Sequence, residues 1–261
     1  MQVISSKENE IVKNIKKLKD KKYRDLNNEY LVEGIKLVKE AICENANIKQ
    51  IVVCENCIQD GTIDKKTLYE IAKYNCTYVT ENVFDSLTDV VNPQGLLAVV
   101  EKGSGDSKIN FNEDFILILD NLQDPGNLGT ILRTADSVNL KQIVISKNSA
   151  DVYNPKVVRS TMGAIFRVKI IESDDLIKTI NEIKKNNFIV MATDLKEASS
   201  IYDEKLNKCA VVIGNEANGV SKEVLEAADK KIKIPMPGKA ESLNASVATG
   251  VILYEYVRQK N

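Results

Sequence analysis

Apolar residues recur along the chain with two periods, one typical of helices and one typical of strands. Ile11, Val12, Ile15 and Leu18 recur at helical spacing, which predicts a helix over residues 5–24. Short apolar or alternating runs between polar residues predict strands. The first hundred residues are therefore expected to contain strands at 30–32, 48–54, 77–80 and 95–100 and helices at 5–24, 34–45 and 65–74. This order predicts a small βαβ-type domain.

From residue 115 onward, strands and helices alternate regularly. Phe115–Leu119 and Cys209–Ile213 are continuous apolar runs with the length of a buried strand. Further strands are expected at 142–146, 167–171, 188–193 and 231–235, and helices at 127–138, 156–162, 174–186, 222–229 and from 244. This alternation predicts an α/β fold with a mainly parallel sheet that helices cover on both faces.

Between these two regions the composition changes. Residues 102–108 read Lys-Gly-Ser-Gly-Asp-Ser-Lys, a polar stretch rich in glycine and serine that is typical of a linker. We therefore expect two domains. The smaller α/β domain covers residues 1–104 and the larger one covers residues 113–261.

Composition excludes several classes of protein. No apolar run approaches the roughly 20 residues of a membrane-spanning helix, and residues 1–14 are charged where a signal peptide is apolar. The five cysteines are expected to be reduced, in a cytoplasmic protein. The chain has no histidine, which excludes Ser-His-Asp and Cys-His catalysis and histidine-ligated metals. Cys54 and Cys57 form one Cys-x-x-Cys pair without the further ligands of a zinc site, so no metal is expected.

The net charge gives no sign of a polyanionic partner, because 36 Lys and Arg residues face 37 Asp and Glu residues. Binding of nucleic acid would therefore depend on a local basic patch. The predicted first helix carries a patch formed by Lys16, Lys17, Lys21, Lys22 and Arg24. These side chains are candidate contacts for phosphates, and a solvated helix face explains them equally well.

A first candidate motif follows the strand Phe115–Leu119. Residues 120–126 form a loop rich in turn-forming residues, and Asn127 stands at the start of the helix that follows. Arg133 lies six residues further on, so that both side chains can border a cleft at the end of the strand. The plainer alternative is a capping asparagine and a surface arginine that pairs with Asp136.

A second motif, Gly-Asn-Glu, follows the strand Cys209–Ile213. Gly214 permits a tight turn and the close approach of a ligand, and Glu216 places a carboxylate at the end of the strand. Ser221 is a suitable N-cap for the next helix. On its own this pattern is weak, because a solvated turn explains it as well.

A third segment ends the last strand and opens the last helix. Ile234 and Met236 are apolar and can face an aromatic ring such as adenine. Ser242, Leu243 and Asn244 lead into a helix whose first turns are dominated by small residues. Two strand ends and one helix start thus present polar and backbone groups together, which is how open α/β sheets build ligand sites.

In this order and spacing, the three segments closely resemble the SpoU/TrmH family of RNA ribose 2′-O-methyltransferases. The resemblance spans residues 113–258 and implies a SPOUT-type fold, whose C-terminal segment is threaded into a trefoil knot. It implies S-adenosylmethionine as the cofactor. The positions that match the family's cofactor pocket are Gly214, Ile234, Met236, Ser242 and Leu243. The positions that match its ribose site are Asn127, Arg133, Glu216, Ser242 and Asn244, with Arg133 as the catalytic residue.

The resemblance also implies partners. The family usually forms homodimers through its last helix, and the N-terminal domain resembles a ribosomal-protein-like RNA-binding domain. Ribosomal RNA is therefore expected in preference to transfer RNA. The chain departs from the commoner Gly-Asn-Glu-Gly at Ala217, where Asn218 and Gly219 supply the flexible turn.

Three other functions compete with this one. A transfer-RNA 2′-O-methyltransferase and a non-catalytic RNA-binding protein that kept the fold both stay open. A dinucleotide-binding enzyme is disfavoured, because no Gly-x-Gly-x-x-Gly follows any of the strands.

Overall fold

The structure is a computed structural model that describes residues 3–103, 108–196 and 198–260. Its contacts divide the chain into two units. Unit 1 comprises Met1–Ser104 and Asp151–Phe166, and unit 2 comprises Gly105–Ala150 and Arg167–Asn261. Residues 104–107 of the predicted linker lie outside the described residues.

The described part of unit 1 contains a five-stranded sheet in the order β1-β4-β3-β5-β2. β5 is antiparallel to both β2 and β3, whereas β4 is parallel to β1 and β3, so the sheet is mixed. The strands are β1 (Val3–Ile4), β2 (Glu29–Glu33), β3 (Ile48–Cys54), β4 (Cys76–Val79) and β5 (Leu96–Glu101). The helices are α1 (Glu10–Lys17), α2 (Lys21–Asn27), α3 (Ile35–Cys43), α4 (Glu55–Gln59), α5 (Lys65–Ile71), α6 (Glu81–Leu87) and α8 (Pro155–Ser160).

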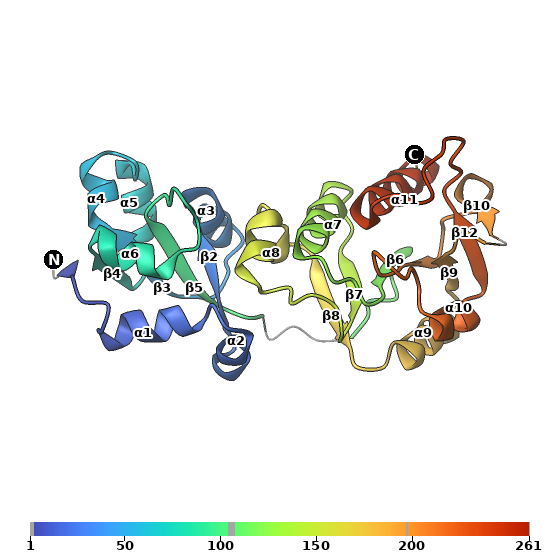
Figure 1. Cartoon of the computed structure of the whole chain (residues 1–261), viewed down its shortest axis with the longest axis horizontal. Coiled ribbons are helices and arrows are strands. Elements are labelled where there is room, and N and C mark those ends of the chain that lie inside the picture. Colours follow the sequence, from blue (N-terminus) through green and yellow to red (C-terminus); the bar gives the residue numbers. More distant parts are fainter. Residues whose placement is uncertain (1–2, 104–107, 197, 261) are drawn as a thin grey trace. The chain divides into compact units, whose positions relative to one another are not determined.

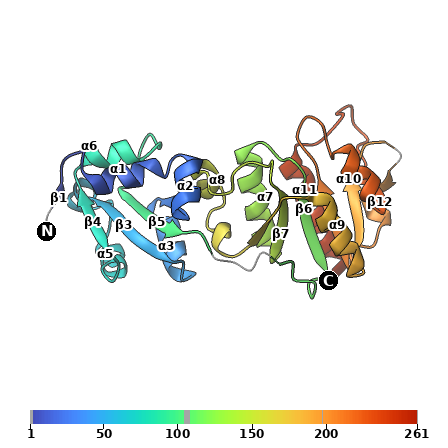
Figure 2. The same cartoon turned by 90° about the horizontal axis from the view of Figure 1, so that it is seen from below.

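Two apolar clusters hold this sheet between its helices. On one face, α1 and α6 bury Val12, Ile15 and Phe84 against the sheet. On the other face, α3 and α5 bury Val38 and Ile71, and Figure 2 shows these two helices across the sheet from α1 and α6. Burial on both faces explains why the strands read as apolar runs.

The single helix predicted over residues 5–24 is wrong. The structure has two helices, α1 and α2, separated by a turn at residues 18–20. Asp20 begins the second helix, because its side chain accepts a hydrogen bond from the backbone N–H of Lys22 at 2.9 Å. A capping aspartate of this kind is a start signal inside what periodicity alone treats as one helix.

The described part of unit 2 contains a seven-stranded sheet in the order β10-β12-β9-β11-β6-β7-β8, with every neighbouring pair parallel. The strands are β6 (Phe115–Leu119), β7 (Gln142–Ser146), β8 (Lys169–Ser173), β9 (Ile189–Thr193), β10 (Ser199–Ser200), β11 (Cys209–Ile213) and β12 (Lys230–Lys233). The helices are α7 (Pro125–Ser137), α9 (Leu176–Lys185), α10 (Lys222–Ala227) and α11 (Ala245–Lys260). The predicted parallel α/β sheet is confirmed.

Helices cover both faces of this second sheet. α9 and α10 bury Ile180, Ile183 and Val224 against one face, and α7 and α11 lie together on the other face (Figure 1). The ring of Tyr256 on α11 packs against Phe115 on β6, with centroids 4.7 Å apart. The carboxyl ends of the central strands are thereby left open for a site.

One segment that lies between two strands of unit 2 in the sequence belongs to unit 1 in the structure. Residues Asp151–Phe166, between β7 and β8, pack with unit 1. They carry α8 and a 3-10 turn at Ala164–Phe166, and Val158 is buried in the core cluster of α3 and α5. In sequence this segment lies within the range 113–261 that was predicted as the second domain.

Candidate active site

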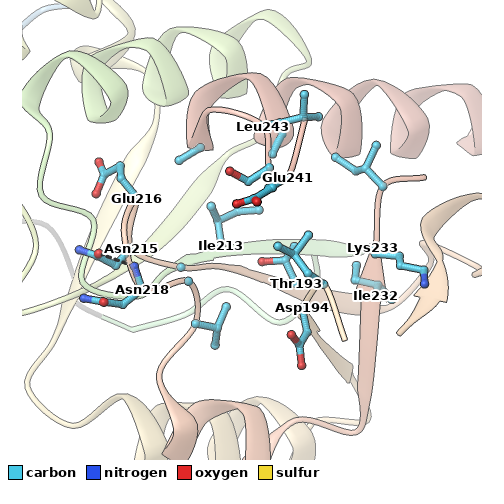
Figure 3. A pocket seen from close by; sticks show the side chains of 18 of the residues that line it. Thr193, Asp194, Ile213, Asn215, Glu216, Asn218, Ile232, Lys233, Glu241 and Leu243 are labelled. Atoms are coloured by element: carbon cyan, nitrogen blue, oxygen red, sulfur yellow. Dashed lines mark hydrogen bonds between the residues drawn. The ribbon is translucent and has the colours of Figure 1, made fainter. Parts of the chain in front are cut away.

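A cavity of about 440 Å³ in unit 2 opens at the carboxyl ends of β9, β11 and β12 and beneath the start of α11 (Figure 3). A volume of this size is typical of sites for small molecules. All five residues predicted to bind the cofactor line it, namely Gly214, Ile234, Met236, Ser242 and Leu243. The structure therefore brings together residues that lie up to 29 positions apart in the sequence.

The lining of this cavity suits a nucleoside that carries a charged amino-acid tail. Ile213, Ile234 and Leu243 offer apolar contact for a flat ring. Asp194 and Glu241 add carboxylates. Burial raises the pKa of Asp194. The hydrogen bonds from the backbone N–H of Lys196 and the ammonium of Lys231 outweigh burial and lower the pKa below its ordinary value, so this carboxyl stays charged. The residues present thus fit S-adenosylmethionine, which is a sulfonium cation with an ammonium group.

Gly214 is required by the turn that closes one side of the cavity. Asn215 and Gly219 exchange two backbone hydrogen bonds of 2.9 Å each, and a Cβ at position 214 would lie 2.0 Å from the carbonyl carbon of Gly219. Gly219 has a φ of +70°, and Ala217 is not among the positive-φ residues. The departure from the family pattern at Ala217 therefore needs no unfavourable backbone conformation.

A chain of hydrogen bonds joins the three predicted motifs. The Glu216 carboxylate accepts from the Nδ2 of Asn127 at 3.0 Å. The Oδ1 of Asn127 in turn accepts from the Nδ2 of Asn244, also at 3.0 Å. Asn244 completes the chain as a cap of α11, because its Oδ1 accepts from the backbone N–H of Ser246 at 2.9 Å.

Glu216 also holds residues 121–124, which we name the α7 entry loop. The carboxylate accepts from the backbone N–H groups of Gln123 at 3.0 Å and of Asp124 at 2.9 Å. Partial burial raises the pKa of Glu216, but the hydrogen bonds from Asn127, Gln123 and Asp124 outweigh it and lower the pKa below its ordinary value. A carboxylate engaged in this way is an anchor for the loop.

The sequence suggested that Asn127 begins its helix, but the structure shows an earlier start. α7 begins two residues earlier, at Pro125, and Asp124 is its N-cap. Asn127 therefore lies inside the first turn, where it is 9% exposed. This position directs its side-chain amide toward Glu216 and Asn244 and leaves the capping bond to Asp124.

Arg133 is exposed on α7 and, among the described residues, has no hydrogen bond or ion pair. Asp136, the partner that its position three residues along the helix suggested, instead pairs with Arg167 at 2.9 Å. The surface ion pair that offered the plainer explanation of Arg133 is therefore not formed. Its guanidinium is free to contact a ligand, although Arg133 does not line the cavity itself.

The basic patch of unit 1 is only partly exposed. Lys16, Lys17, Lys21 and Lys22 are exposed, whereas Arg24 is 2% exposed. Arg24 donates to the carbonyl oxygens of residues 18 and 19 and pairs with an aspartate. Its guanidinium is therefore engaged within the protein, whereas the sequence predicted that it contacts phosphates. Its position on the inner face of α2, which the predicted single helix did not show, is the reason.

Sequence reasoning missed several residues that support the site. Gln123 and Asp124 act through backbone N–H groups, which side-chain identity does not reveal. Asp120 accepts from the backbone N–H of Ser221 at 2.8 Å. Ser221 does precede α10 as predicted, but its side chain makes no capping bond.

The described residues contain no group of three or more His, Cys, Asp or Glu side chains that could hold a metal ion. In the same part of the chain, no helix is long and apolar enough to cross a membrane.

Two family models match the chain. The model described as the SpoU rRNA Methylase family matches residues 114–254. The model described as the MRM3-like substrate binding domain matches residues 9–98. The first covers the cavity and all three motifs, and the second covers most of unit 1.

Similar proteins and structures agree with these matches. The 23S rRNA (guanosine(2553)-2′-O)-methyltransferase RlmP of Bacillus subtilis is 33% identical over 260 residues, which cover 97% of this chain and 98% of that protein. The structure of an S-adenosylmethionine-bound rRNA methyltransferase from Sinorhizobium meliloti is 28% identical, with a TM-score of 0.84 over 98% of this chain and 97% of that one. A solved RNA 2′-O ribose methyltransferase also has a TM-score of 0.84, at 28% identity and with 99% of each chain covered. The chain therefore belongs to the SpoU rRNA methylase family, the S-adenosylmethionine-dependent RNA 2′-O-methyltransferases.

Proposed function

We propose that this protein methylates the 2′-hydroxyl of one ribose in ribosomal RNA, with Arg133 as its catalytic residue. The observation that carries the proposal is the chain Glu216–Asn127–Asn244, which ties the start of α7 to the cavity and to α11. Ribosomal RNA is favoured because the B. subtilis relative is named for 23S rRNA.

Each residue has a distinct part in this proposal. Gly214, Ile234 and Leu243, with Met236 and Ser242 beside them, would hold S-adenosylmethionine, which supplies an electrophilic methyl group when bound. A ribose hydroxyl is a weak nucleophile, so much of the acceleration comes from holding its oxygen in line with the methyl carbon. Asn127, Glu216 and Asn244 serve that alignment by fixing the α7 entry loop.

Arg133 has the chemistry to stabilise the hydroxyl oxygen as its proton passes to an adjacent phosphate of the RNA. An arginine stays protonated in proteins, and its planar fork presents several donors at once. It therefore orients the ribose and an adjacent phosphate and stabilises developing negative charge. The chain has no histidine that could take this part.

We propose that RNA phosphates are contacted by Lys16, Lys17, Lys21 and Lys22 on α1 and α2. The centroid of the Tyr23 ring lies 5.7 Å from the Nζ of Lys17 and 5.7 Å from that of Lys22. Lys21 is partly neutralised, because it pairs with Asp25 at 2.9 Å. An aromatic ring among ammonium groups suits a nucleic acid, since bases stack on rings and phosphates pair with lysines.

We further propose a cytoplasmic homodimer formed through α11. Val247 and Tyr254 are 52% and 56% exposed on this helix, and they lie two turns apart on one face. Exposed apolar side chains of this kind are typical of an interface between subunits. The trefoil knot implied by the family stays a prediction.

Mapping of ribose methylation over all ribosomal and transfer RNAs, with and without the protein, tests the substrate. We expect one ribosomal nucleotide to lose its 2′-O-methyl group in cells that lack the protein. Purified protein with S-adenosylmethionine should restore the mark on the unmethylated RNA. Loss of a mark from transfer RNA alone would contradict the proposed substrate, and restoration by Arg133→Ala protein would contradict the proposed catalyst.

A further inference from the structure

Three carboxylates line the cavity that we assign to S-adenosylmethionine, and two of them are engaged within the protein. Glu216 accepts the hydrogen bonds that hold the α7 entry loop. Asp194 accepts from the backbone N–H of Lys196 at 3.2 Å and pairs with the ammonium of Lys231 at 3.4 Å. Each of these two carboxylates therefore has partners that offset its charge and fix its position.

Glu241 is the third carboxylate, and it has no such partner. It is exposed, and within the ranges that the structure describes it makes no hydrogen bond or ion pair. Figure 3 shows its side chain between Leu243 and Ile213, whereas the side chain of Lys233 extends away from it. Glu241 is thus an unpaired negative charge on an apolar part of the cavity wall, where a cationic group of a ligand would be attracted.

S-adenosylmethionine has two cationic groups, the sulfonium and the ammonium of its amino-acid tail. Methyl transfer breaks the bond from sulfur to the methyl carbon as the bond to the ribose oxygen forms. The electron pair of the broken bond stays on sulfur, and the hydroxyl proton passes to the RNA phosphate. The product, S-adenosylhomocysteine, therefore keeps the ammonium and loses the sulfonium charge. A carboxylate beside the sulfonium favours the cofactor over this product, whereas a carboxylate beside the ammonium favours neither.

The position of Glu241 favours the sulfonium. Glu241 directly precedes Ser242, and the side chain of Asn244, three residues further on, donates to Asn127 at 3.0 Å. Ser242, Asn244 and Asn127 are the positions that we assign to the ribose. The reacting methyl group has to face the ribose, so the sulfonium that carries it belongs on this side of the cavity. Asp194, by contrast, follows β9 on a different strand end.

We propose that Glu241 is a specificity-determining residue whose carboxylate favours the sulfonium cofactor over its neutral product. Specificity of this kind is a difference between two affinities. The attraction ends when the sulfonium charge is lost, so the product leaves and fresh cofactor replaces it. The inference rests on the proposed function and deepens it, because the ribose site decides which side of the cavity receives the sulfonium.

Glu241→Gln is the direct test, because it removes the charge and keeps the shape. The side chain is exposed and unpaired among the described residues, so the fold does not depend on it. Calorimetry measures the Kd of each protein for S-adenosylmethionine and for S-adenosylhomocysteine. We expect the Kd for S-adenosylmethionine to rise by about fivefold, which is the upper range for a solvent-exposed ion pair. The Kd for S-adenosylhomocysteine should stay within about twofold of wild type.

Sinefungin provides a second probe of the same charge. In this analogue a carbon that bears an ammonium group replaces the sulfonium, so the positive charge is kept without a transferable methyl group. We expect Glu241→Gln to weaken sinefungin binding by about as much as it weakens binding of S-adenosylmethionine, again about fivefold.

Glu223→Gln is the matched control. Glu223 is exposed on α10, carries the same charge and does not line the cavity. This variant should leave every Kd within about twofold of wild type, because a distant exposed charge is screened by solvent and salt. An equal effect of both substitutions would mean that net charge alone attracts the cofactor, and it would refute the inference.

Two further results overturn the inference. An equal loss of affinity for S-adenosylmethionine and S-adenosylhomocysteine in Glu241→Gln would assign the carboxylate to the ammonium. An unchanged Kd for S-adenosylmethionine would show that Glu241 contacts neither group. If wild-type protein binds S-adenosylmethionine but methylates no RNA, the proposed function fails, and the binding measurements still decide the part of Glu241.

Discussion

Arg133 is the residue whose chemistry the rest of the site serves. Arg133→Lys keeps the positive charge but loses the planar fork, so we expect the methyl-transfer rate to fall by about a hundredfold. Affinity for S-adenosylmethionine should change by less than about twofold, because Arg133 does not line the cavity. Single-turnover kinetics and calorimetry measure the two effects separately.

Arg167→Lys is a suitable control for that experiment. Arg167 pairs with Asp136, which lies on α7 like Arg133, so the guanidinium of Arg167 is already engaged. We expect normal turnover from this variant. Equal activity of Arg133→Lys and wild type would remove Arg133 from the mechanism.

Glu216 gives a prediction about pH. Its pKa in the folded protein lies below the ordinary value of 4.5, so the ionised carboxylate stabilises the folded state above that value. This contribution is lost as the pH falls through the lowered pKa. Glu216→Gln should therefore melt below wild type at pH 7, and the gap should narrow as the pH falls below 4.5. Thermal unfolding of both proteins over this range checks it, and a gap that does not change with pH would contradict the assigned bonds.

At the scale of single residues, the sequence predicted which side chains belong to the site but not how they are bonded. Gly214, Ile234 and Leu243 were identified by resemblance, and all three line the cavity. The bond between Asn127 and Asn244 joins residues 117 positions apart, and its geometry depends on how α7 and α11 pack. Local patterns carry no information on such a distance.

At the scale of elements, buried strands were the easiest to predict. β6, β7 and β11 have the predicted bounds, because strands buried on both faces contain few polar residues. β3 also has its predicted bounds, which its alternating pattern indicated. The short helices α4 and α6 were not predicted, because five or seven residues give too little periodicity. The same weakness concealed the division between α1 and α2.

That division changes the prediction for RNA binding. We expect the triple variant Lys16→Gln, Lys17→Gln and Lys22→Gln to reduce the slope of log K against log salt by about 2 to 3, because each lost phosphate contact removes about 0.7 to 0.9. The measurement is RNA affinity at several salt concentrations. The control replaces Lys65, Lys66 and Lys73, which lie on or near α5 on the other face of the sheet. An equal change in both triple variants would mean that net charge alone, and no particular surface, attracts RNA.

At the scale of the whole molecule, the fold class and the family were predicted from three short motifs, and the family matches confirm them. The mixed pairing in unit 1 was not foreseen, because apolar runs do not specify strand direction. The return of residues 151–166 to unit 1 was equally hidden. A segment between two strands of one sheet reads locally like any other crossover connection.

The proposed dimer belongs to this scale as well. We expect Tyr254→Asp to convert the dimer into a monomer, because a buried unpaired charge is strongly unfavourable at an interface. Light scattering after size-exclusion chromatography measures the mass. Tyr202→Asp is the control, since Tyr202 is 50% exposed but is not part of α11, lying between β10 and β11 in the sequence. A monomeric wild-type protein at micromolar concentration would refute the dimer.

The segment 151–166 has a practical consequence for dissecting the protein. Unit 1 is built from two separate stretches of chain, so no single cut can release it whole. An isolated fragment that ends near residue 103 would lack α8 and leave the apolar neighbours of Val158 open to water. The complementary fragment would carry Val158 without the buried residues of α3 and α5 that it packs with. Exchanging substrate specificity between relatives therefore requires transplanting both stretches together, and a simple fusion at the linker would graft an incomplete module.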